Sequence, residues 1–196
     1  MASITPPPLS LVTGANLKKL GGEEASETLV SEQLWQNQPA VILVLRRPGC
    51  LLCRAEAKSL YALKAELDEL GVRLVCVVHE GLPAEIKAFW PEYWPGELYL
   101  DTDKKLYKAL GNGKLRKGSL LWFLNPFSVI WQHAREAKEV HKIQDSNLKG
   151  DGLTMGGLLV LKQGDGGVAY AYAEERFGDH AGNEVILKIC KEIAAR

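Results

Sequence analysis

Residues 40–54 read AVILVLRRPGCLLCR, and the rest of the chain is best understood from them. The first six, residues 40–45, form a continuous apolar run, which predicts a strand covered on both faces of its sheet. A turn with proline and glycine follows, and Cys50 and Cys53 then stand with two residues between them. The sequence therefore predicts a cysteine pair at the junction between a buried strand and a helix.

The pattern continues as a strand–helix–strand unit. Apolar residues recur at helical spacing over residues 50–70, Gly71 ends the pattern, and residues 72–78 form a second apolar run. Because a helical crossover joins parallel strands, the two apolar runs are expected to pair in parallel. The other expected elements are strands at residues 96–100, 158–161 and 168–173 and helices at residues 23–36, 83–89, 104–110 and 183–195.

The order of these elements predicts an α/β fold of the thioredoxin-like type, a three-layer arrangement whose mixed central sheet has helices on both faces. The last two strands are expected to pair antiparallel through a glycine-rich turn at residues 163–167. An aromatic-rich helical insertion over residues 119–144 precedes the fourth core strand. This insertion either packs against the sheet or forms an apolar surface beside the cysteine sulfurs. One domain is expected over residues 13–196, after a flexible leader at residues 1–12.

Composition argues against several classes of function. The 24 Lys and Arg residues equal the 24 Asp and Glu residues, so the formal net charge is zero, which argues against nucleic acid as the main partner. No apolar run approaches the roughly 20 residues of a transmembrane helix. Four cysteines are too few for a disulfide scaffold in 196 residues, so a reducing compartment is expected. The expected location is cytoplasmic, with an organelle, plastid or mitochondrion, as the alternative.

The cysteine pair suits thiol–disulfide chemistry. The thiolate is the nucleophile, and a helix N-terminus or a nearby cation lowers a cysteine pKa from about 8.5 into a range of about 3.5–7.5. Cys50 is expected at the start of the helix, as the exposed attacking sulfur. Cys53 lies one helical turn further on, so it is expected to reach Cys50 and resolve the intermediate as an intramolecular disulfide. The candidate thiolate-stabilising cations are Arg46, Arg47 and Arg54.

Two other interpretations of the pair are a zinc half-site and two inert cysteines. A zinc site needs two more ligands, and the chain offers no second close pair, so no metal is expected. Cys76 and Cys190 are interpreted as core residues on a strand and on the last helix. The histidines lack a triad-like setting, and residues 174–180 are interpreted as a charged surface loop before the last helix.

The string from Arg46 to Arg54, together with Glu56-Ala57, closely resembles the peroxiredoxin-like 2 family. This is a thioredoxin-fold group related to selenoprotein U and to prostamide/prostaglandin F synthase. The likeness covers most of residues 30–180. The resemblance implies antioxidant or redox-regulatory activity through a Cys50–Cys53 dithiol that cycles with its disulfide.

The resemblance also implies partners and positioning residues. The substrate is expected to be a small peroxide or disulfide, and the reductant an external thiol such as glutathione or thioredoxin. No G-x-G-x-x-G motif is present, so no tightly bound cofactor is expected and any NADPH dependence is indirect. Pro48 and Gly49 shape the turn before the pair, and Gly156 stands roughly where thioredoxins place a cis-proline opposite the sulfurs. The alternatives are a prostaglandin H2 or prostamide reductase, as in the related branch, and a non-enzymatic redox sensor.

Overall fold

The computed structural model describes residues 3–21, 27–119, 129–143 and 145–195. Its strands form one mixed sheet in the order β1-β8-β7-β4-β5-β6-β2-β3. The strands are β1 (Ser3–Ile4), β2 (Asn16–Leu20), β3 (Thr28–Val30), β4 (Ala40–Val44), β5 (Arg73–Val78), β6 (Glu97–Leu100), β7 (Gly157–Leu161) and β8 (Val168–Ala173). The helices are η1 (Leu9–Leu11) and η2 (Ser31–Leu34), both 3-10, and α1 (Leu51–Tyr61), α2 (Lys64–Glu69), α3 (Pro83–Phe89), α4 (Lys105–Ala109), α5 (Val129–Glu139) and α6 (Asn183–Ala194).

Strand β4 lies at the centre of the sheet. All of its residues are fully buried, as the continuous apolar run predicts. It pairs in parallel with β5 and antiparallel with β7, and β5 pairs in parallel with β6. The parallel strand–helix–strand unit and the antiparallel β7–β8 hairpin confirm the predicted sheet.

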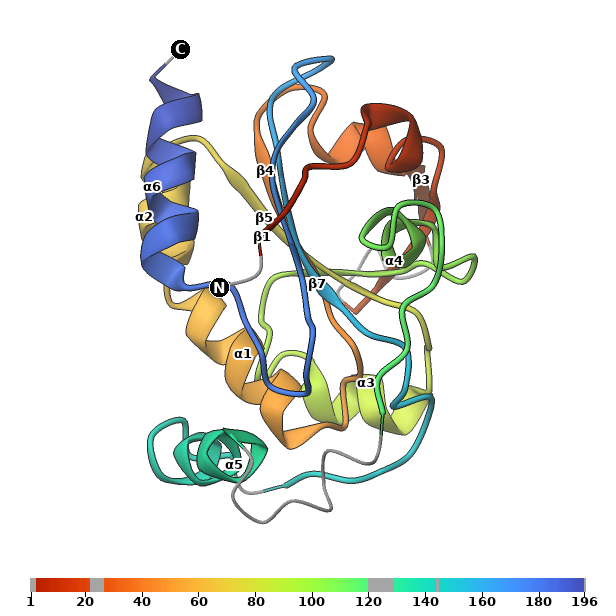
Figure 1. Cartoon of the computed structure of the whole chain (residues 1–196), viewed down its shortest axis with the longest axis vertical. Coiled ribbons are helices and arrows are strands. Elements are labelled where there is room, and N and C mark those ends of the chain that lie inside the picture. Colours follow the sequence, from red (N-terminus) through yellow and green to blue (C-terminus); the bar gives the residue numbers. More distant parts are fainter. Residues whose placement is uncertain (1–2, 22–26, 120–128, 144, 196) are drawn as a thin grey trace.

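Alternate residues of β4 face two apolar layers. Val41 and Leu43 belong to the layer that α1, α2 and α6 cover. Ile42 and Val44 belong to the opposite layer, which holds η1, η2 and α4. The predicted three-layer arrangement, with helices on both faces of the sheet, is therefore confirmed (Figure 1). Among the described residues, no helix is both long and apolar enough to span a bilayer.

Two predictions for the N-terminal part of the chain are wrong. The helix expected over residues 23–36 is replaced, in its described part, by β3 and η2, because residues 28–30 pair antiparallel with β2. The β-branched side chains of Thr28 and Val30 suit such a strand better than a helix. The leader expected to be flexible carries η1 and also β1, which pairs with β8, and Val12 just beyond η1 is fully buried. Apolar side chains of this segment cover one face of the sheet, which explains its regular structure.

The long helix expected over residues 50–70 is two helices, with a short break between α1 and α2. In that break the amide of Leu63 bonds to the carbonyl of Leu60 at 3.0 Å, which is a tighter turn than that of an α-helix. Gly71 ends the second helix with a φ of 66°, in the left-handed region that favours glycine, as the sequence predicts.

The aromatic-rich insertion lies partly outside the described residues. Its most aromatic part, residues 120–128, is not described, so both interpretations of it stay predictions. The described part includes α5, which packs against α1. Ala137 and Ile143 contribute buried side chains to the apolar layer that contains α1.

Gly156 stands just before β7, beside the end of β4. A β-carbon there would overlap the carbonyl oxygen of Val44 and lie 3.0 Å from the backbone nitrogen of Arg46. We predict that Gly156→Ala lowers the free energy of unfolding by about 1–3 kcal/mol, because backbone rather than a flexible side chain has to move. Urea denaturation followed by circular dichroism measures this change.

Gly182→Ala is the matched control for this substitution, since the nearest atom to a β-carbon at Gly182 is 4.0 Å away. Gly182 is the N-cap of α6 and has a φ of −67°, which alanine also adopts. Its replacement should therefore cost less than about 1 kcal/mol. Equal unfolding midpoints for Gly156→Ala and the wild type would contradict the packing argument.

Candidate active site

The turn between β4 and α1 places Cys50 at the N-terminus of α1. The amide of Cys50 bonds to the carbonyl of Arg47 at 3.3 Å, which closes the turn. The amide of Arg54 bonds to the carbonyl of Cys50 at 3.0 Å, which starts the helix. Cys50 itself has extended backbone angles, φ −83° and ψ 132°, as is typical of an N-cap residue. The predicted junction of strand, turn and helix is therefore confirmed.

Pro48 and Gly49 join this turn to the chain that follows α5. A β-carbon at Gly49 would overlap side-chain oxygens of Glu85 and Asn147, so these side chains pack directly against the turn. The carbonyl of Gly49 accepts a hydrogen bond of 2.8 Å from the amide of Asn147. The carbonyl of Pro48 accepts one of 2.7 Å from the Arg54 side chain. Gly49 therefore contacts the segment after α5 directly, and Pro48 contacts the Arg54 side chain, which binds the same segment.

The two sulfurs are buried together. Cys50 is 6% exposed and Cys53 is 2% exposed, and both are free thiols in this structure. Hydrogen bonding from the Cys53 side chain holds the pKa of Cys50 well below its ordinary value; burial opposes this effect, and the charge of Arg46 adds to it. Burial, together with the same hydrogen bond, raises the pKa of Cys53 well above its ordinary value. The pair thus consists of one readily ionised sulfur and one that holds its proton.

The expectation of an exposed Cys50 is wrong, because its sulfur lies beneath the Arg46 side chain. Nη2 of Arg46 is 2.7 Å from the sulfur, and Nη1 donates a hydrogen bond of 2.8 Å to the carbonyl of Gly152. The same guanidinium lies over the ring of Phe177, 4.4 Å from the ring centroid. Although burial works against its charge, the two cysteine sulfurs raise the pKa of Arg46. A buried thiolate needs a buried counter-charge, and this arrangement supplies one while covering the sulfur.

Arg47 and Arg54 bind the segment at residues 145–152, here called the covering loop. Arg47 donates hydrogen bonds of 2.8 Å to two of its carbonyl groups. Arg54 donates one of 2.8 Å to the carbonyl of Asp145 and pairs with the carboxylate of that residue at 2.6 Å. Arg46 therefore takes the predicted thiolate-stabilising position, and the charge of Arg47 also lowers the pKa of Cys50. Arg47 and Arg54 in addition bind the covering loop, which Arg46 contacts at Gly152.

A buried acid cluster, formed by Glu56, Glu174 and His180, lies near the pair and was missed by the sequence analysis. Glu56 is 8% exposed and Glu174 is 2% exposed. One potential ligand atom from each of the three side chains lies within 4.8 Å of the other two, and Nδ1 of His180 is 3.2 Å from a Glu56 oxygen. The interpretation of residues 174–180 as a surface loop is therefore wrong in part, since Glu174 and Phe177 belong to the interior.

Burial and mutual charge set the ionisation of the acid cluster. Burial and the charge of Glu56 raise the pKa of Glu174 to about 8, although Arg46 opposes this shift. Burial disfavours the charged form of His180, but the Glu56 carboxylate outweighs it and raises the pKa of His180 to about 9. The one signal for the cluster in the sequence is that Glu56 follows Cys53 by three residues, which is the same face of a helix.

The other two cysteines are core residues, as predicted. Cys76 in β5 and Cys190 in α6 are fully buried, and burial raises their pKa values, that of Cys190 to about 11. Within the described ranges, the group of side chains placed closely enough to hold a metal ion is the acid cluster, which includes neither Cys50 nor Cys53. The zinc half-site interpretation therefore finds no further ligands for the pair in this part of the chain.

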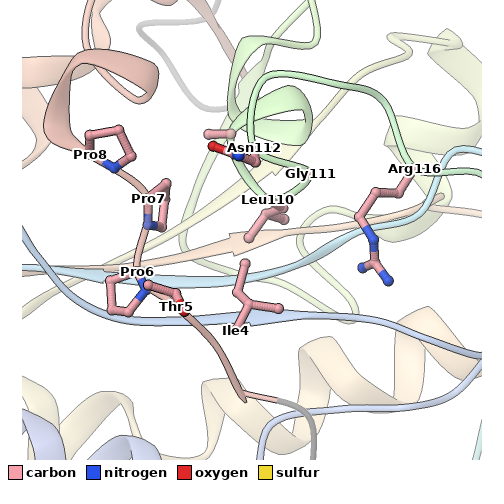
Figure 2. Close-up of a pocket in the computed structure, with 10 residues that line it drawn as sticks. Ile4, Thr5, Pro6, Pro7, Pro8, Leu110, Gly111, Asn112 and Arg116 are labelled. Atoms are coloured by element: carbon pink, nitrogen blue, oxygen red, sulfur yellow. The ribbon is translucent and has the colours of Figure 1, made fainter.

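A separate surface pocket of about 440 Å³ lies between the N-terminal segment and the end of α4 (Figure 2). Residues 4–8 line one side of it and residues 109–112 the other, with Arg116 at its edge. Arg116 also donates a hydrogen bond of 2.8 Å to the backbone carbonyl of Glu174. No cysteine lines this pocket, so we assign it to the N-terminal segment and not to the sulfur site.

A thioredoxin-type sheet with an easily ionised cysteine at the start of the helix after its central strand defines a thiol redox protein. A family model described as "AhpC/TSA antioxidant enzyme" matches residues 59–176. Peroxiredoxin-like 2A of Mus musculus is 37% identical over 190 residues, which cover 94% of this chain and 80% of that protein. Peroxiredoxin-like 2A of Homo sapiens is 36% identical over 190 residues, which cover 94% of this chain and 76% of that protein. The chain therefore belongs to the AhpC/TSA antioxidant enzyme family and to its peroxiredoxin-like 2 group.

Solved structures show the same fold. Peroxiredoxin Q of Xanthomonas campestris has a TM-score of 0.63 at 14% identity and covers 98% of both chains. The mitochondrial 2-Cys peroxiredoxin of Plasmodium falciparum has a TM-score of 0.57 at 10% identity and covers 91% of this chain and 88% of that one. At such identities the likeness concerns the fold alone. The family match begins at residue 59 and therefore does not include Cys50 and Cys53.

The contact between Arg46 and the Cys50 sulfur predicts a change in reactivity on substitution. Arg46→Gln removes the cation that lies 2.7 Å from the sulfur, so we expect the pKa of Cys50 to rise. Alkylation of Cys50 by iodoacetamide at neutral pH should slow about tenfold, because the thiolate is the reactive form. Arg47→Gln is the control, since it keeps Arg46 in place, and it should slow alkylation less. Equal effects of the two substitutions would contradict the assigned role of Arg46.

The covering loop predicts a local change in stability. Arg47→Ala removes two hydrogen bonds to residues 145–152, so we expect amide exchange in this loop to speed at least about tenfold while α6 is unchanged. Hydrogen exchange followed by mass spectrometry measures both regions. Arg176→Ala is the matched control, because Arg176 is exposed, and it should leave exchange unaltered. Faster exchange of the whole chain in Arg47→Ala would argue against a local role.

Proposed function

We propose that this protein is a thiol-dependent oxidoreductase that cycles Cys50 and Cys53 between dithiol and disulfide, with small peroxides as oxidants. The observation that carries the proposal is the Cys50 sulfur, held 2.7 Å from Arg46 at the N-terminus of α1. The helix terminus and the guanidinium both favour the thiolate, which is the form that attacks peroxides and disulfides. Membership of the family supports the same class of chemistry.

The first step of the proposed cycle uses the Cys50 thiolate. Its sulfur attacks one oxygen of the peroxide, so that an S–O bond forms and the O–O bond breaks. The leaving oxygen takes a proton from solvent and departs as water or an alcohol, and Cys50 becomes a sulfenic acid. Arg46, in contact with the sulfur, balances the negative charge throughout this step.

The second step uses Cys53, whose side chain acts on that of Cys50 directly enough to lower its pKa. The Cys53 thiol loses its proton, and its thiolate attacks the sulfenic sulfur, so that the S–S bond forms and the S–O bond breaks; the hydroxide that leaves takes up one proton and becomes water. Two external thiol groups then reduce the disulfide and become a disulfide themselves. Glutathione or thioredoxin would serve as this donor in a reducing cytosol, and no tightly bound cofactor takes part.

The burial of Cys50 and Cys53 limits the size of the substrates that can reach them. Cys50 is 6% exposed, and Arg46, which contacts its sulfur, is bonded to the covering loop, so the site suits a small peroxide better than a large oxidant. A bulky reductant reaches the buried disulfide only when the covering loop moves. Arg47 and Arg54 hold that loop through backbone carbonyls, so these hydrogen bonds have to break before the loop is displaced.

Cysteine variants test the cycle. With hydrogen peroxide and a thioredoxin or glutathione system, the wild type should turn over repeatedly and Cys50→Ser should not react. Cys53→Ser should react once, stop at the sulfenic acid, and form no intramolecular disulfide. Mass spectrometry of the alkylated protein follows each form.

Cys190→Ala is the matched control, because Cys190 is a core residue of α6, and it should keep turnover. Turnover retained by Cys50→Ser would contradict the proposal. A wild type that reacts once and is not recycled by any thiol donor would be a redox sensor, the non-enzymatic alternative.

A further inference from the structure

The acid cluster has no role in the proposed cycle of Cys50 and Cys53, although it lies close to the cysteine turn. Glu174 directly follows β8, and its amide bonds to the carbonyl of Gly156 at 3.1 Å. Its carboxylate in turn accepts a bond of 3.3 Å from the amide of Gly156. A β-carbon at Gly156 would lie 3.0 Å from the backbone nitrogen of Arg46. These contacts anchor the carboxylate beside the start of the cysteine turn.

The second step of the cycle requires an acceptor for one proton. Cys53 is 2% exposed and holds its proton, because burial raises its pKa. A thiol is a poor nucleophile, so Cys53 has to lose that proton before it attacks the Cys50 sulfur. With so little exposure to water, the proton needs a base inside the protein.

Glu56 and Glu174 approach Cys53 from two different elements. Glu56 follows Cys53 by three residues on α1, a spacing that puts their β-carbons about 5–6 Å apart on one face. Glu174 comes from the end of β8, and its charge contributes, after burial, to the raised pKa of Cys53. The buried thiol therefore has Glu56 one helical turn away on α1 and lies within electrostatic reach of the Glu174 carboxylate.

Neighbouring charges make Glu174 a stronger base than an ordinary carboxylate. Burial and the negative charge of Glu56 raise its pKa to about 8, against the opposing charges of Arg46 and His180. His180, with a pKa of about 9, is protonated at neutral pH and forms an ion pair with Glu56. A carboxylate whose acid has a pKa near 8 is a stronger base than an ordinary carboxylate, so it accepts a proton from a thiol of raised pKa more readily.

We propose that Glu174 accepts the proton that Cys53 releases as the disulfide forms. Glu56 and His180 are positioning residues that set the charge of Glu174 and connect it to solvent, since the His180 side chain is 29% exposed. This inference rests on the proposed cycle of Cys50 and Cys53.

Disulfide formation moves one proton from Cys53 to Glu174. The S–H bond of Cys53 breaks, the proton moves to the Glu174 carboxylate, and the thiolate attacks the Cys50 sulfur. The S–S bond forms as the S–O bond breaks, and hydroxide leaves and takes a proton from solvent. Glu174 then returns its proton to solvent past His180. When an external thiol reduces the disulfide, the Cys53 thiolate that is released takes up a proton from solvent by the same route, through Glu174.

Single-turnover measurements on Glu174→Gln separate this step from the first. After mixing with hydrogen peroxide, quenching and mass spectrometry resolve the sulfenic acid from the disulfide. Sulfenic acid formation should stay within about twofold of the wild type, and disulfide formation should slow about 100-fold, as expected for loss of a general base. In the wild type the rate of disulfide formation should level off above pH about 8, and in the variant this plateau should be absent. A purely structural role would not remove the plateau.

Three further variants sharpen the test. Glu175→Gln is the matched control, because Glu175 is exposed, and both rates should be unchanged. Glu174→Asp should restore part of the rate of disulfide formation. Glu56→Gln should move the plateau to lower pH, because it removes the negative charge that strengthens Glu174 as a base. If Glu174→Gln does not fold, the position of the plateau in Glu56→Gln tests the inference: an unchanged plateau would contradict it.

Several outcomes would overturn the inference. Glu174→Gln that forms the disulfide at the wild-type rate, with the wild-type pH profile, refutes it directly. A rate of disulfide formation in the wild type that falls on treatment with EDTA would reassign the acid cluster to a metal ion. A wild type that never forms a bond between Cys50 and Cys53 would instead remove the proposed function on which the inference rests.

Discussion

A negative charge on the buried Cys50 sulfur can persist because Arg46 lies against it. Removing an ion from water costs several kcal/mol unless a well-placed partner compensates. The Arg46 guanidinium is that partner, and it is itself held by the carbonyl of Gly152 and by the ring of Phe177. One ionic contact therefore depends on three separate parts of the chain: the turn after β4, the covering loop and the segment after β8.

Neighbouring arginines in one short string serve two different purposes. Arg46 contacts the sulfur, whereas Arg47 and Arg54 bind carbonyl groups of the covering loop. The guanidinium group carries five donors in a fixed plane, so it can bind several backbone oxygens while it contributes charge. The cover over the site and the counter-charge within it therefore come from the same few residues, and the access of substrates is tied to the ionisation of the sulfur.

The family relationship and the cysteine chemistry occupy adjoining parts of the chain. The family match spans residues 59–176, which include β5 to β8 and the buried Glu174. The cysteine pair lies before that match, in the turn that follows β4. The sheet supplies a rigid frame, and the turn places the sulfurs at the end of its central strand, where strands β7 and β8 also bring the acid cluster.

The amino-acid sequence alone determined the features whose signal is local. The apolar run at residues 40–45, the glycine-rich hairpin at residues 163–167 and the spacing of Cys50 and Cys53 are each read from a few adjacent residues. They led correctly to the central strand, the β7–β8 pair and the cysteine turn at a helix N-terminus. The helix expected over residues 23–36 was wrong because pairing with β2, which is not local, decided the structure there.

Only the tertiary structure decided that Cys50 is buried and that Glu174 is an interior acid. Both results depend on segments that are distant in sequence, such as the contact of Arg54 with a residue 91 positions away and that of Arg46 with one 106 positions away. Periodicity and composition show which face of a helix or strand is buried in the core and which face is exposed to solvent. Periodicity and composition do not show which distant loop will cover a sulfur. The position of that loop depends on how the whole sheet brings its strand ends together.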